Sequence, residues 1–544
     1  MSDTAPRYPY RPRADQRAPR PAQHPVIIVG AGPVGLALAI DLVLRGIPAV
    51  VLDEDDTVSV GSRSICWAKR TLEIYDRLGC AEPMMARGVT WNRGNVFHGD
   101  RLLYEFNLLP EEGHRFPAFI NLQQNLAEEI FVARAETLAG DGLDLRWKNR
   151  VTNVVPADDH VRVDIDTPDG PYALRCDYLV AADGVRSTVR RVLGLDFKGR
   201  VFEDRFLISD VKMRAEFPPE RRFWFDPTFH GGRSALLHRQ ADDVWRIDLQ
   251  LGADADPELE LQSERVVARL RRMLGPKIAF EVAWSSLYTF QCRRLERFRH
   301  GRVFFAGDAA HQVSPFGARG GNGGVQDADN LAWKLALVLK GAAPERLLDS
   351  YDAERIPAAD ENILHSTRAT DFMTPKTAAS AAFRDAALSL AERYPFARGF
   401  VNSGRLSRPA TLDASPLNTP ERDAFTPVLR PGSPAADAPI RTPQGGETSW
   451  LLRELRNGFT ALCFGDDGAA ASVGALANGP VPVAVKRIGP GALADPSGRA
   501  AQRYDARPGT LYLIRPDQHV AGRWRRPDAD QIRSALERAL ALQE

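Results

Sequence analysis

The stretch from residue 26 to residue 53 constrains the fold of this chain more than any other. It runs from a short apolar segment, VIIV, through GAGPVG and LALAIDLVLRG to a second strand-like segment, PAVVLD. This order predicts a β-α-β unit with glycines in its first turn. Gly30 permits the tight turn, Gly32 lets the backbone approach a pyrophosphate, and Gly35 lets the helix pack closely on the strand. The residues expected to bind phosphates at the start of the helix are Gly30, Gly32, Pro33, Val34 and Gly35.

Two carboxylates follow at the end of the second predicted strand. Asp53 is placed to accept a hydrogen bond from a ribose hydroxyl, and Glu54 beside it is a further candidate for cofactor binding. Because strand, turn, helix and carboxylate stand in order, we interpret the motif as a dinucleotide site rather than a structural glycine turn. Gly489-Pro490-Gly491 is not followed by an apolar helix and a second strand that ends in a carboxylate, so it is interpreted as a turn. A single fingerprint disfavours enzymes that carry a separate nicotinamide domain.

Residues 302–322, RVFFAGDAAHQVSPFGARGGN, form a second informative stretch. A buried strand is expected to end at Gly307-Asp308, and a proline and several glycines then lead into an amphipathic helix. The glycines expose backbone N–H groups, and the helix directs its positive end toward them. This arrangement favours a bound anion or a polarised cofactor.

The composition is that of a soluble globular protein. The chain has 544 residues, 44% of them hydrophobic, and a formal net charge of +1, so nothing indicates nucleic acid or an anionic membrane as a partner. No apolar run approaches the roughly 20 residues that span a bilayer. The cysteines form no CxxC pair and no zinc-ligand spacing, which predicts a cytoplasmic protein without a metal. They are Cys66, Cys80, Cys176, Cys292 and Cys463.

A third motif makes the pattern specific. DYLVAADGVRSTVRR, with Asp183-Gly184, stands between the two stretches above. The three motifs in this order resemble those of the single-component FAD-dependent aromatic hydroxylases, the group that includes p-hydroxybenzoate hydroxylase and phenol hydroxylase. SRSICWAKRTLEIYDRLG and NLQQNLAEEI resemble the branch containing 3-(3-hydroxyphenyl)propionate hydroxylase. The resemblance covers about residues 25–400, and the segment after 450 resembles the thioredoxin-like domain of phenol hydroxylase.

The resemblance implies an α/β fold with an α+β substrate part: a Rossmann-like FAD-binding domain, an inserted antiparallel-sheet domain and a thioredoxin-like domain. Alternation in VWRIDLQL, residues 244–251, supports the inserted sheet. The expected segments are a disordered tail (1–24), the FAD-binding domain (25–199 and, with further helices, 296–404), the substrate-binding sheet (200–295), a linker (405–449) and a thioredoxin-like domain without CxxC (450–544).

The resemblance also implies roles for residues of the second stretch. Asp308, after Gly307, would bind the ribityl chain of FAD, and Pro315 would shape the wall beside the flavin ring. Backbone N–H groups near Gly320 would face the N1–C2 edge of the ring. His311 would either lie near the flavin or brace the loop. The remaining implied cofactor residues are Gly321 and Asn322 at the ring edge, Arg63 at the phosphates, Gln124 at the flavin side chain, Asp183 at FAD and the nicotinamide, and Arg186 at the nicotinamide pyrophosphate, with Arg190 and Arg63 alternatively surface charges.

The implied activity has two halves. NAD(P)H reduces FAD, and the reduced flavin reacts with O2 to a C4a-hydroperoxide that hydroxylates a phenolic or aminoaromatic ring. The partners would be a small aromatic substrate and O2, with a homodimer suggested by analogy. Two alternatives stay open: an FAD-dependent dehydrogenase or reductase without oxygen insertion, and a non-catalytic flavoprotein redox sensor.

The substrate pocket should lie between the FAD domain and the inserted sheet. His238 or Tyr288 would act as the base, and Pro315 would border the reaction centre. Each polar candidate taken alone is more often an ordinary sheet residue than a substrate contact. The candidate substrate-binding residues are Arg246, Asp248, Gln250 and Gln291. Asp53, Arg319 and Gly321 depart from the residues usual in the family.

Overall fold

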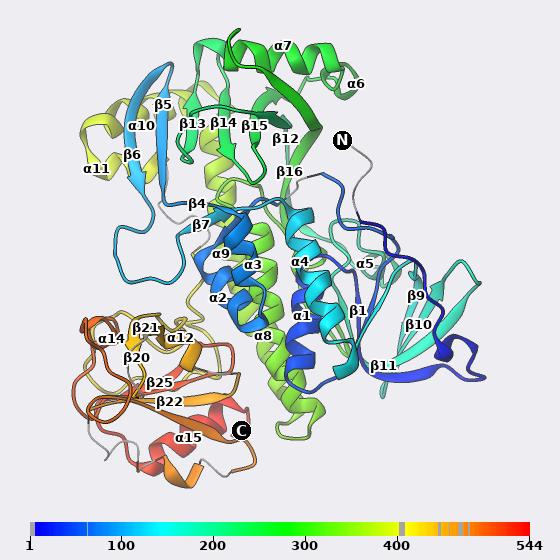
Figure 1. Cartoon of the computed structure of the whole chain (residues 1–544), viewed down its shortest axis with the longest axis vertical. Coiled ribbons are helices and arrows are strands. Elements are labelled where there is room, and N and C mark those ends of the chain that lie inside the picture. Colours follow the sequence, from blue (N-terminus) through cyan, green and yellow to red (C-terminus); the bar gives the residue numbers. More distant parts are fainter. Residues whose placement is uncertain are drawn as a thin grey trace.

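The computed structural model describes residues 6–543, apart from 62–63, 402–407, 444–447, 456, 466–470, 472 and 477–478. Three layers follow one another along the long axis (Figure 1). A large antiparallel sheet lies at one end, a sheet-and-helix body that contains the N-terminal glycine motif lies in the middle, and the C-terminal elements lie at the other end. No helix in the described part of the chain is long and apolar enough to cross a membrane.

The middle layer is built on a largely parallel sheet. Its path is β17-β18-β11-β1-β2-β8, and β9 and β10 form an antiparallel branch on β11. Strands β1, β2 and β18 end in fully buried apolar residues, as strands covered on both faces do. The strands are β1 (Ala22–Val29), β2 (Ala49–Leu52), β8 (Leu143–Arg146), β9 (Arg150–Pro156), β10 (Val161–Asp166), β11 (Tyr172–Ala181), β17 (Arg299–His300) and β18 (Val303–Phe305).

Helices pack on this sheet, and two of them carry the glycine motifs at their N-termini. These two, α1 (Pro33–Leu44) and α8 (Gly320–Leu339), lie against each other. A small sheet in the order β3-β7-β4 lies nearby. The other elements of this layer are β3 (Cys66–Ala68), α2 (Lys69–Leu78), α3 (Ala81–Arg87), β4 (Val89–Trp91), β7 (Phe119–Asn121), α4 (Gln124–Thr137), α5 (Thr188–Val192) and α9 (Ser350–Met373).

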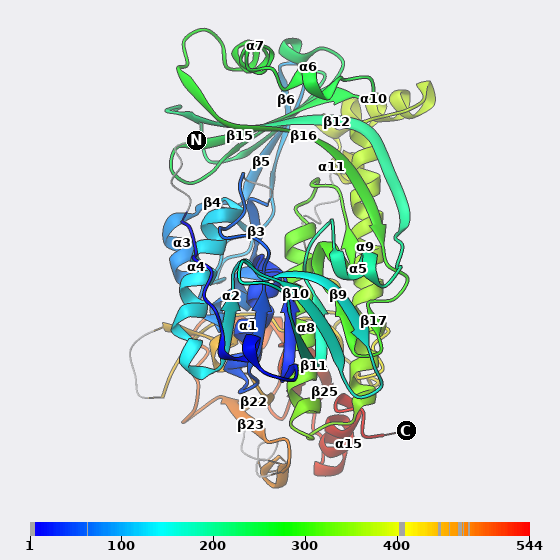
Figure 2. The same ribbon diagram turned by 90° about the vertical axis from the view of Figure 1, so that its right-hand side faces the viewer.

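The second large sheet has the order β19-β16-β12-β15-β14-β13-β5-β6. The alternation expected at residues 244–251 is present: Trp245, Ile247 and Leu249 pack against α7 (Ser263–Leu274), on the face away from the glycine motifs. Figure 2 shows the long strands β12 and β16 reaching from this sheet down along the middle layer. The strands are β5 (Arg93–His98), β6 (Arg101–Asn107), β12 (Lys198–Met213), β13 (Arg221–Phe225), β14 (Ser234–Arg239), β15 (Val244–Gly252), β16 (Phe280–Arg294) and β19 (His311–Gln312).

Two boundaries of the expected sheet domain need correction. Strands β5 and β6 come from the segment assigned to the first domain, because β5 pairs in parallel with β13 more than a hundred residues later. Strand β19 belongs to the second glycine motif and pairs with the end of β16. Pairing between such distant segments leaves no local signal in the sequence.

The expected tail and linker are also packed where they are described. Tyr8 stacks on Trp147 with ring centroids 4.7 Å apart, and Asp15 pairs with Arg146 at 2.6 Å. Within the expected linker, the Ser415 hydroxyl donates a hydrogen bond to Glu354 of α9. The composition of both segments is typical of disorder, but their aromatic and polar side chains find partners elsewhere in the chain.

The C-terminal layer contains a four-stranded sheet in the order β23-β22-β24-β25. Strand β22 is parallel to β23 and antiparallel to β24. Cys463 is buried on β22. The elements are β20 (Pro439–Arg441), β21 (Thr448–Trp450), α12 (Leu451–Glu454), β22 (Phe459–Phe464), β23 (Val483–Ile488), α14 (Arg499–Arg503), β24 (Leu511–Ile514), β25 (Val520–Trp524) and α15 (Ala529–Ala539); α10 (Ala378–Arg393) and α11 (Pro395–Val401) lie beside β6.

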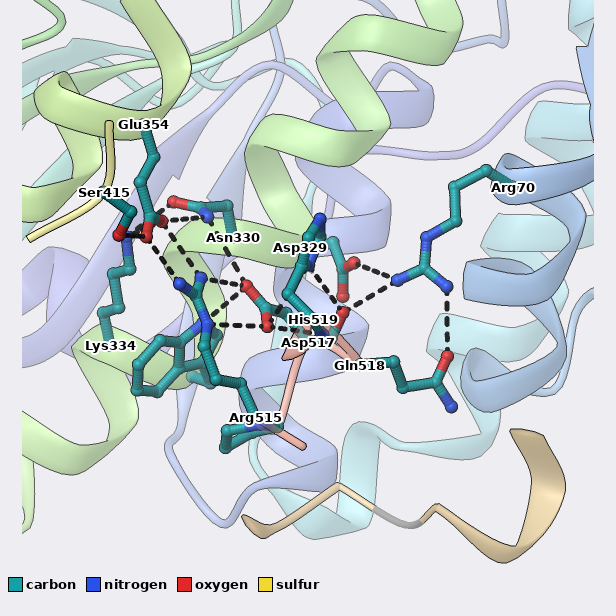
Figure 3. Close-up of polar contacts among 12 residues, drawn as sticks. Arg70, Asp329, Asn330, Lys334, Glu354, Ser415, Arg515, Asp517, Gln518 and His519 are labelled. Atoms are coloured by element: carbon teal, nitrogen blue, oxygen red, sulfur yellow. Dashed lines mark hydrogen bonds and ion pairs between the residues drawn. The ribbon is translucent and has the colours of Figure 1, made fainter. Parts of the chain in front are cut away.

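A buried polar network joins this layer to the middle one (Figure 3). Arg515, between β24 and β25, donates hydrogen bonds to Glu354 at 2.5 and 3.0 Å and to Asp517. Lys334 of α8 binds the same Glu354 at 2.7 Å, and Trp333 donates to Asp517 at 3.1 Å. The far end of α8 is therefore held by the C-terminal layer.

Candidate active site

The first glycine motif forms the turn between β1 and α1. Gly30 has a φ of +106°, and a Cβ there would lie 2.5 Å from the carbonyl oxygen of Ala182. A Cβ on Gly35 would lie 2.0 Å from the carbonyl oxygen of Gly30. A Cβ on Gly32 would meet nothing within 4 Å, so Gly32 leaves open space beside the N-terminus of α1. Gly30 and Gly35 serve the fold, whereas Gly32 leaves the room that a pyrophosphate needs.

Asp53 reaches back to this turn from the end of β2. Its carboxylate accepts hydrogen bonds from the backbone N–H groups of Ala31 at 2.6 Å and Asp55 at 2.9 Å. Burial raises the pKa of Asp53 to about 6, although these hydrogen bonds act in the opposite direction. Glu54 is exposed. The carboxylate thus lies beside the phosphate turn, where a ribose would follow the pyrophosphate.

The second glycine motif is braced by a buried carboxylate of α8. Asp327 accepts hydrogen bonds from the Gly307 N–H at 3.0 Å, His311 Nε2 at 2.6 Å and Arg355 Nε at 2.7 Å. Burial alone would raise the pKa of Asp327, but the charges of His311 and Arg355 hold it below its usual value. His311 therefore braces the loop, and the partly buried Asp308 follows Gly307 within it.

Helix α8 begins against the small sheet. The Asn322 side chain accepts a hydrogen bond from the Ala68 N–H at 2.8 Å and donates to the carbonyls of Cys66 at 2.8 Å and Ala318 at 2.6 Å. A Cβ on Gly321 would lie 2.8 Å from Ser64 Oγ. Asn322 thus contributes its side chain to the fold, and the first backbone N–H groups of α8, near Gly320, are what it can offer to a ligand.

Gln124 positions the loop that precedes the small sheet. Its side chain accepts a hydrogen bond from the Ser64 N–H at 3.1 Å and donates to Ser59 Oγ at 3.0 Å and to Glu128 at 2.7 Å. Arg63 lies outside the described residues. The predicted contact of Gln124 with the flavin stays a prediction.

The third motif ends β11. Asp183 Oδ2 accepts a hydrogen bond from the Val189 N–H at 3.1 Å, but its Oδ1 is buried without a partner among the described residues, and burial raises the pKa of this carboxyl. An unsatisfied buried oxygen beside the glycine motifs suits a hydroxyl of a bound cofactor. Arg186 is exposed, whereas Arg190 covers the Phe197 ring and donates to the carbonyls of Val185 and Ala309.

The polar substrate candidates gather on the face of the second sheet that looks toward the glycine motifs. Arg246 is paired with Asp210 through Nε–Oδ1 and Nη2–Oδ2 contacts of 3.0 and 3.2 Å. His238 Nε2 lies 3.9 Å from Asp248 Oδ2. Burial, reinforced by the charges of Arg221 and Arg246, holds the pKa of His238 well below its usual value. Burial raises the pKa of Asp248 to about 6.

Two of these groups lack partners. His238 Nδ1 and Asp248 Oδ1 are buried and form no hydrogen bond with the described residues. Gln250, by contrast, accepts a hydrogen bond from the Ser234 N–H at 3.0 Å, and Tyr288 is 38% exposed. Alternation along β16 turns Gln291 away from the face that carries Tyr288 and Phe290.

An aromatic wall connects this polar face to the second glycine motif. Phe316, which follows the exposed Pro315, packs on Phe206 and Phe290 with ring centroids 5.1 and 5.0 Å apart. The sheet face and the loop therefore border one region, which combines apolar surface with unsatisfied polar groups. A separate cavity of about 530 Å³, lined by His230 and Arg272 among others, lies beside α7 on the other side of the sheet.

Sequence reasoning missed Arg221, which is buried on this face at the start of β13. In the sequence, only the two adjacent arginines of RRFWF indicate a functional role for this residue. They become informative only once β13 is placed in the sheet. Taken together, the open space at Gly32, the orphaned oxygen of Asp183 and the N-terminus of α8 fit the pyrophosphate, the hydroxyls and the polar ring edge of FAD.

Comparisons with known proteins agree with this geometry. Residues 23–366 match the family described as FAD binding domain. The chain is 34% identical to 6-methylpretetramide 4-monooxygenase of Streptomyces rimosus, over 95% of this chain and 94% of that protein. It is 28% identical to a 3-(3-hydroxy-phenyl)propionate/3-hydroxycinnamic acid hydroxylase of Mycolicibacterium smegmatis, over 95% and 94% of the two chains.

Solved structures show the same architecture. The anhydrotetracycline hydroxylase of Streptomyces rimosus superimposes with a TM-score of 0.70 at 28% identity, covering 95% of this chain and 99% of that one. Aklavinone-11 hydroxylase with FAD and aklavinone gives 0.78 at 25% identity, covering 96% and 100%. These relatives support hydroxylation over the two alternatives left open by the sequence. The chain belongs to the FAD-binding family of flavin-dependent aromatic monooxygenases, enzymes that use FAD and NAD(P)H to hydroxylate an aromatic ring.

Proposed function

We propose that this monooxygenase hydroxylates a fused-ring phenolic compound on the face of the second sheet. The observation that carries the proposal is the packed aromatic cluster of Phe206, Phe290 and Phe316 beside the buried polar groups of β14 and β15. A flat polycyclic ring can lie against these aromatic side chains while its hydroxyl groups reach the polar side chains. Relatives named for 6-methylpretetramide and anhydrotetracycline support this substrate class over a single ring.

Bound FAD would supply the redox chemistry, taking a hydride from NAD(P)H and passing one oxygen atom of O2 to the substrate. The chain's own residues bind and orient. Asp248 and His238 present an unpartnered oxygen and an unpartnered ring nitrogen to a substrate hydroxyl, so either can accept its proton. Phe316 and Pro315 help to keep water from the ring.

The other assignments complete the proposal. The cofactor residues act as the resemblance implies, Arg186 contacts the nicotinamide cofactor, and Tyr288 and Gln250 border the substrate, whereas Gln291 lies on the opposite face of β16. The five buried, unpaired cysteines support a cytoplasmic enzyme. O2 is the second substrate, and the oligomeric form is a homodimer.

The test uses FAD-loaded protein with NADH or NADPH under labelled ¹⁸O₂. The panel contains 1-naphthol, an anthracenol and a hydroxynaphthacene beside phenol and 3-(3-hydroxyphenyl)propionate. We expect faster NAD(P)H oxidation and a product carrying one labelled oxygen from a fused-ring phenol. Labelled product from a single-ring phenol alone would contradict the substrate class, and peroxide without any labelled product would contradict oxygen insertion.

A further inference from the structure

Arg221 carries a buried charge that forms no ion pair with the described residues, although the carboxylate of Asp248 acts on it from a distance. The residue is 6% exposed. Its Nε is a buried atom without a hydrogen-bond partner, and its guanidinium forms no ion pair with any described residue. A guanidinium stays charged at every physiological pH, and burying an unpaired charge is costly.

Other buried arginines of this chain are neutralised. Arg246, on the same sheet face, binds Asp210 through two contacts, Arg355 binds Asp327, and Arg515 binds Glu354. The fold thus pairs such charges where it can, and Arg221 departs from that pattern. An arginine left unpaired inside a site is expected to find its anion in a ligand.

The position of Arg221 points to the substrate as that ligand. Arg221 lies on the same side of β13 as Phe223 and Phe225, and its guanidinium carbon lies 5.8 Å from the Phe223 ring centroid. Phe223 and Phe225 pack with the aromatic wall of Phe206 and Phe290. The charge of Arg221 adds to the burial that lowers the pKa of His238 and opposes the burial that raises the pKa of Asp248, so the three groups share one region.

We propose that Arg221 binds an ionised oxygen of the aromatic substrate and thereby makes the enzyme selective for acidic aromatic compounds. The guanidinium fork binds a phenolate, an enolate or a carboxylate through charge-assisted hydrogen bonds. Asp210 already binds the guanidinium of Arg246, whereas the guanidinium of Arg221 forms no ion pair with a described residue and can bind the ligand directly. The inference rests on the proposed function, because that function places the substrate on this face.

The experiment measures ligand binding to the FAD-loaded protein without turnover. The probes are 1-hydroxy-2-naphthoate and its uncharged methyl ether methyl ester, and the signal is the change in flavin absorbance. The wild-type protein should bind the acid roughly tenfold or more tightly than the neutral analogue. Arg221→Met should remove this preference, and Arg221→Lys should restore part of it.

Arg222→Met is the matched control. Arg222 stands opposite Leu237, which packs on the α7 side of the sheet, so its replacement should leave the preference unchanged. Arg221→Met should unfold at no lower denaturant concentration than the wild type, because it removes an unpaired buried charge. A preference that stays within twofold of the wild-type value in Arg221→Met would overturn the proposal, as would a wild-type protein that binds both probes equally or neither.

The negative charge of the reduced flavin is the other source of an anion. If Arg221 serves the flavin, Arg221→Met would lower the flavin midpoint potential while leaving the ligand preference intact, and this result would refute the proposal. The binding ratio is read without oxygen insertion. An acid preference that depends on Arg221, in a protein that hydroxylates nothing, would therefore contradict only the proposed function.

Discussion

Gly32 and Gly35 stand three residues apart in one motif, yet they meet different needs. A Cβ on Gly35 would collide with the Gly30 carbonyl, whereas the site of a Cβ on Gly32 is open and its φ of −76° suits any residue. Both glycines belong to the same sequence motif, and only the backbone geometry shows that the fold requires Gly35 but leaves the space beside Gly32 open.

Gly32→Ala is therefore expected to fold like the wild type but to lose FAD. The added methyl group would occupy space next to the pyrophosphate, so FAD affinity should fall at least roughly tenfold, the effect of about 1.4 kcal/mol. Fluorescence titration with FAD measures the affinity, and circular dichroism of the apoprotein confirms the fold. Gly140→Ala, also at an open position, is the control. Equal FAD affinity in both variants would show that the pyrophosphate does not lie against Gly32.

Motifs made of residues close together in the sequence were predictable. Hydrogen-bond partners from distant parts of the chain were not. The phosphate turn and the Asp53 carboxylate follow from 28 consecutive residues, 26–53, and the structure shows both. The side-chain role of Asn322 was not predictable, because its partners Cys66 and Ala68 lie more than 250 residues earlier. Arg221 was missed for the same reason.

At the scale of elements, α8 connects the cofactor site to the rest of the molecule. Its N-terminus begins at the second glycine motif, Asp327 in its second turn holds the Gly307 loop, and Lys334 lies in the network of Figure 3. The sequence predicted this helix from its amphipathic spacing. It did not indicate that β5 and β6 complete the second sheet. Strand β5 pairs in parallel with a strand more than a hundred residues later, and no tight turn in the sequence marks such a pairing.

Asp327→Ala should lower the free energy of unfolding by about 3–5 kcal/mol, the usual effect of leaving one member of a buried ion pair alone. Arg355 and His311 would lose their carboxylate, and the Gly307 N–H would lose its acceptor. Guanidinium denaturation followed by circular dichroism measures the change. Asp371→Ala removes an exposed partner of Arg200 on α9 and should change stability by less than about 1 kcal/mol. Similar values for the two variants would contradict the bracing role.

At the scale of the whole molecule, buried ion pairs connect the C-terminal layer to the middle layer, which contains the glycine motifs. Arg515, Glu354 and Asp517 are fully buried where the layers meet, and burial lowers the pKa of Lys334 to about 8 despite its contact with Glu354. We expect the two layers to unfold together, because neither can expose this network without leaving charges unpaired in the other.

Arg515→Met tests this coupling. It should lower the free energy of unfolding by about 3–5 kcal/mol and shift flavin release and tryptophan fluorescence to the same lower denaturant concentration. Arg430→Met, which breaks the exposed pair with Asp413, should shift neither signal by more than about 1 kcal/mol. Flavin release at the wild-type concentration, with only the tryptophan signal shifted, would show that the C-terminal layer unfolds by itself.

The second large sheet takes its strands from residues 93–107, 198–252, 280–294 and 311–312. Its edge strand β19 is at the same time part of the loop that follows Gly307. Replacing one continuous segment of the gene therefore cannot exchange this sheet for that of a relative without also changing residues of the middle layer. New substrate ranges are therefore open to this chain through replacement of individual side chains, and a chimaera that swaps residues 200–295 alone would separate β13 from the β5 with which it pairs.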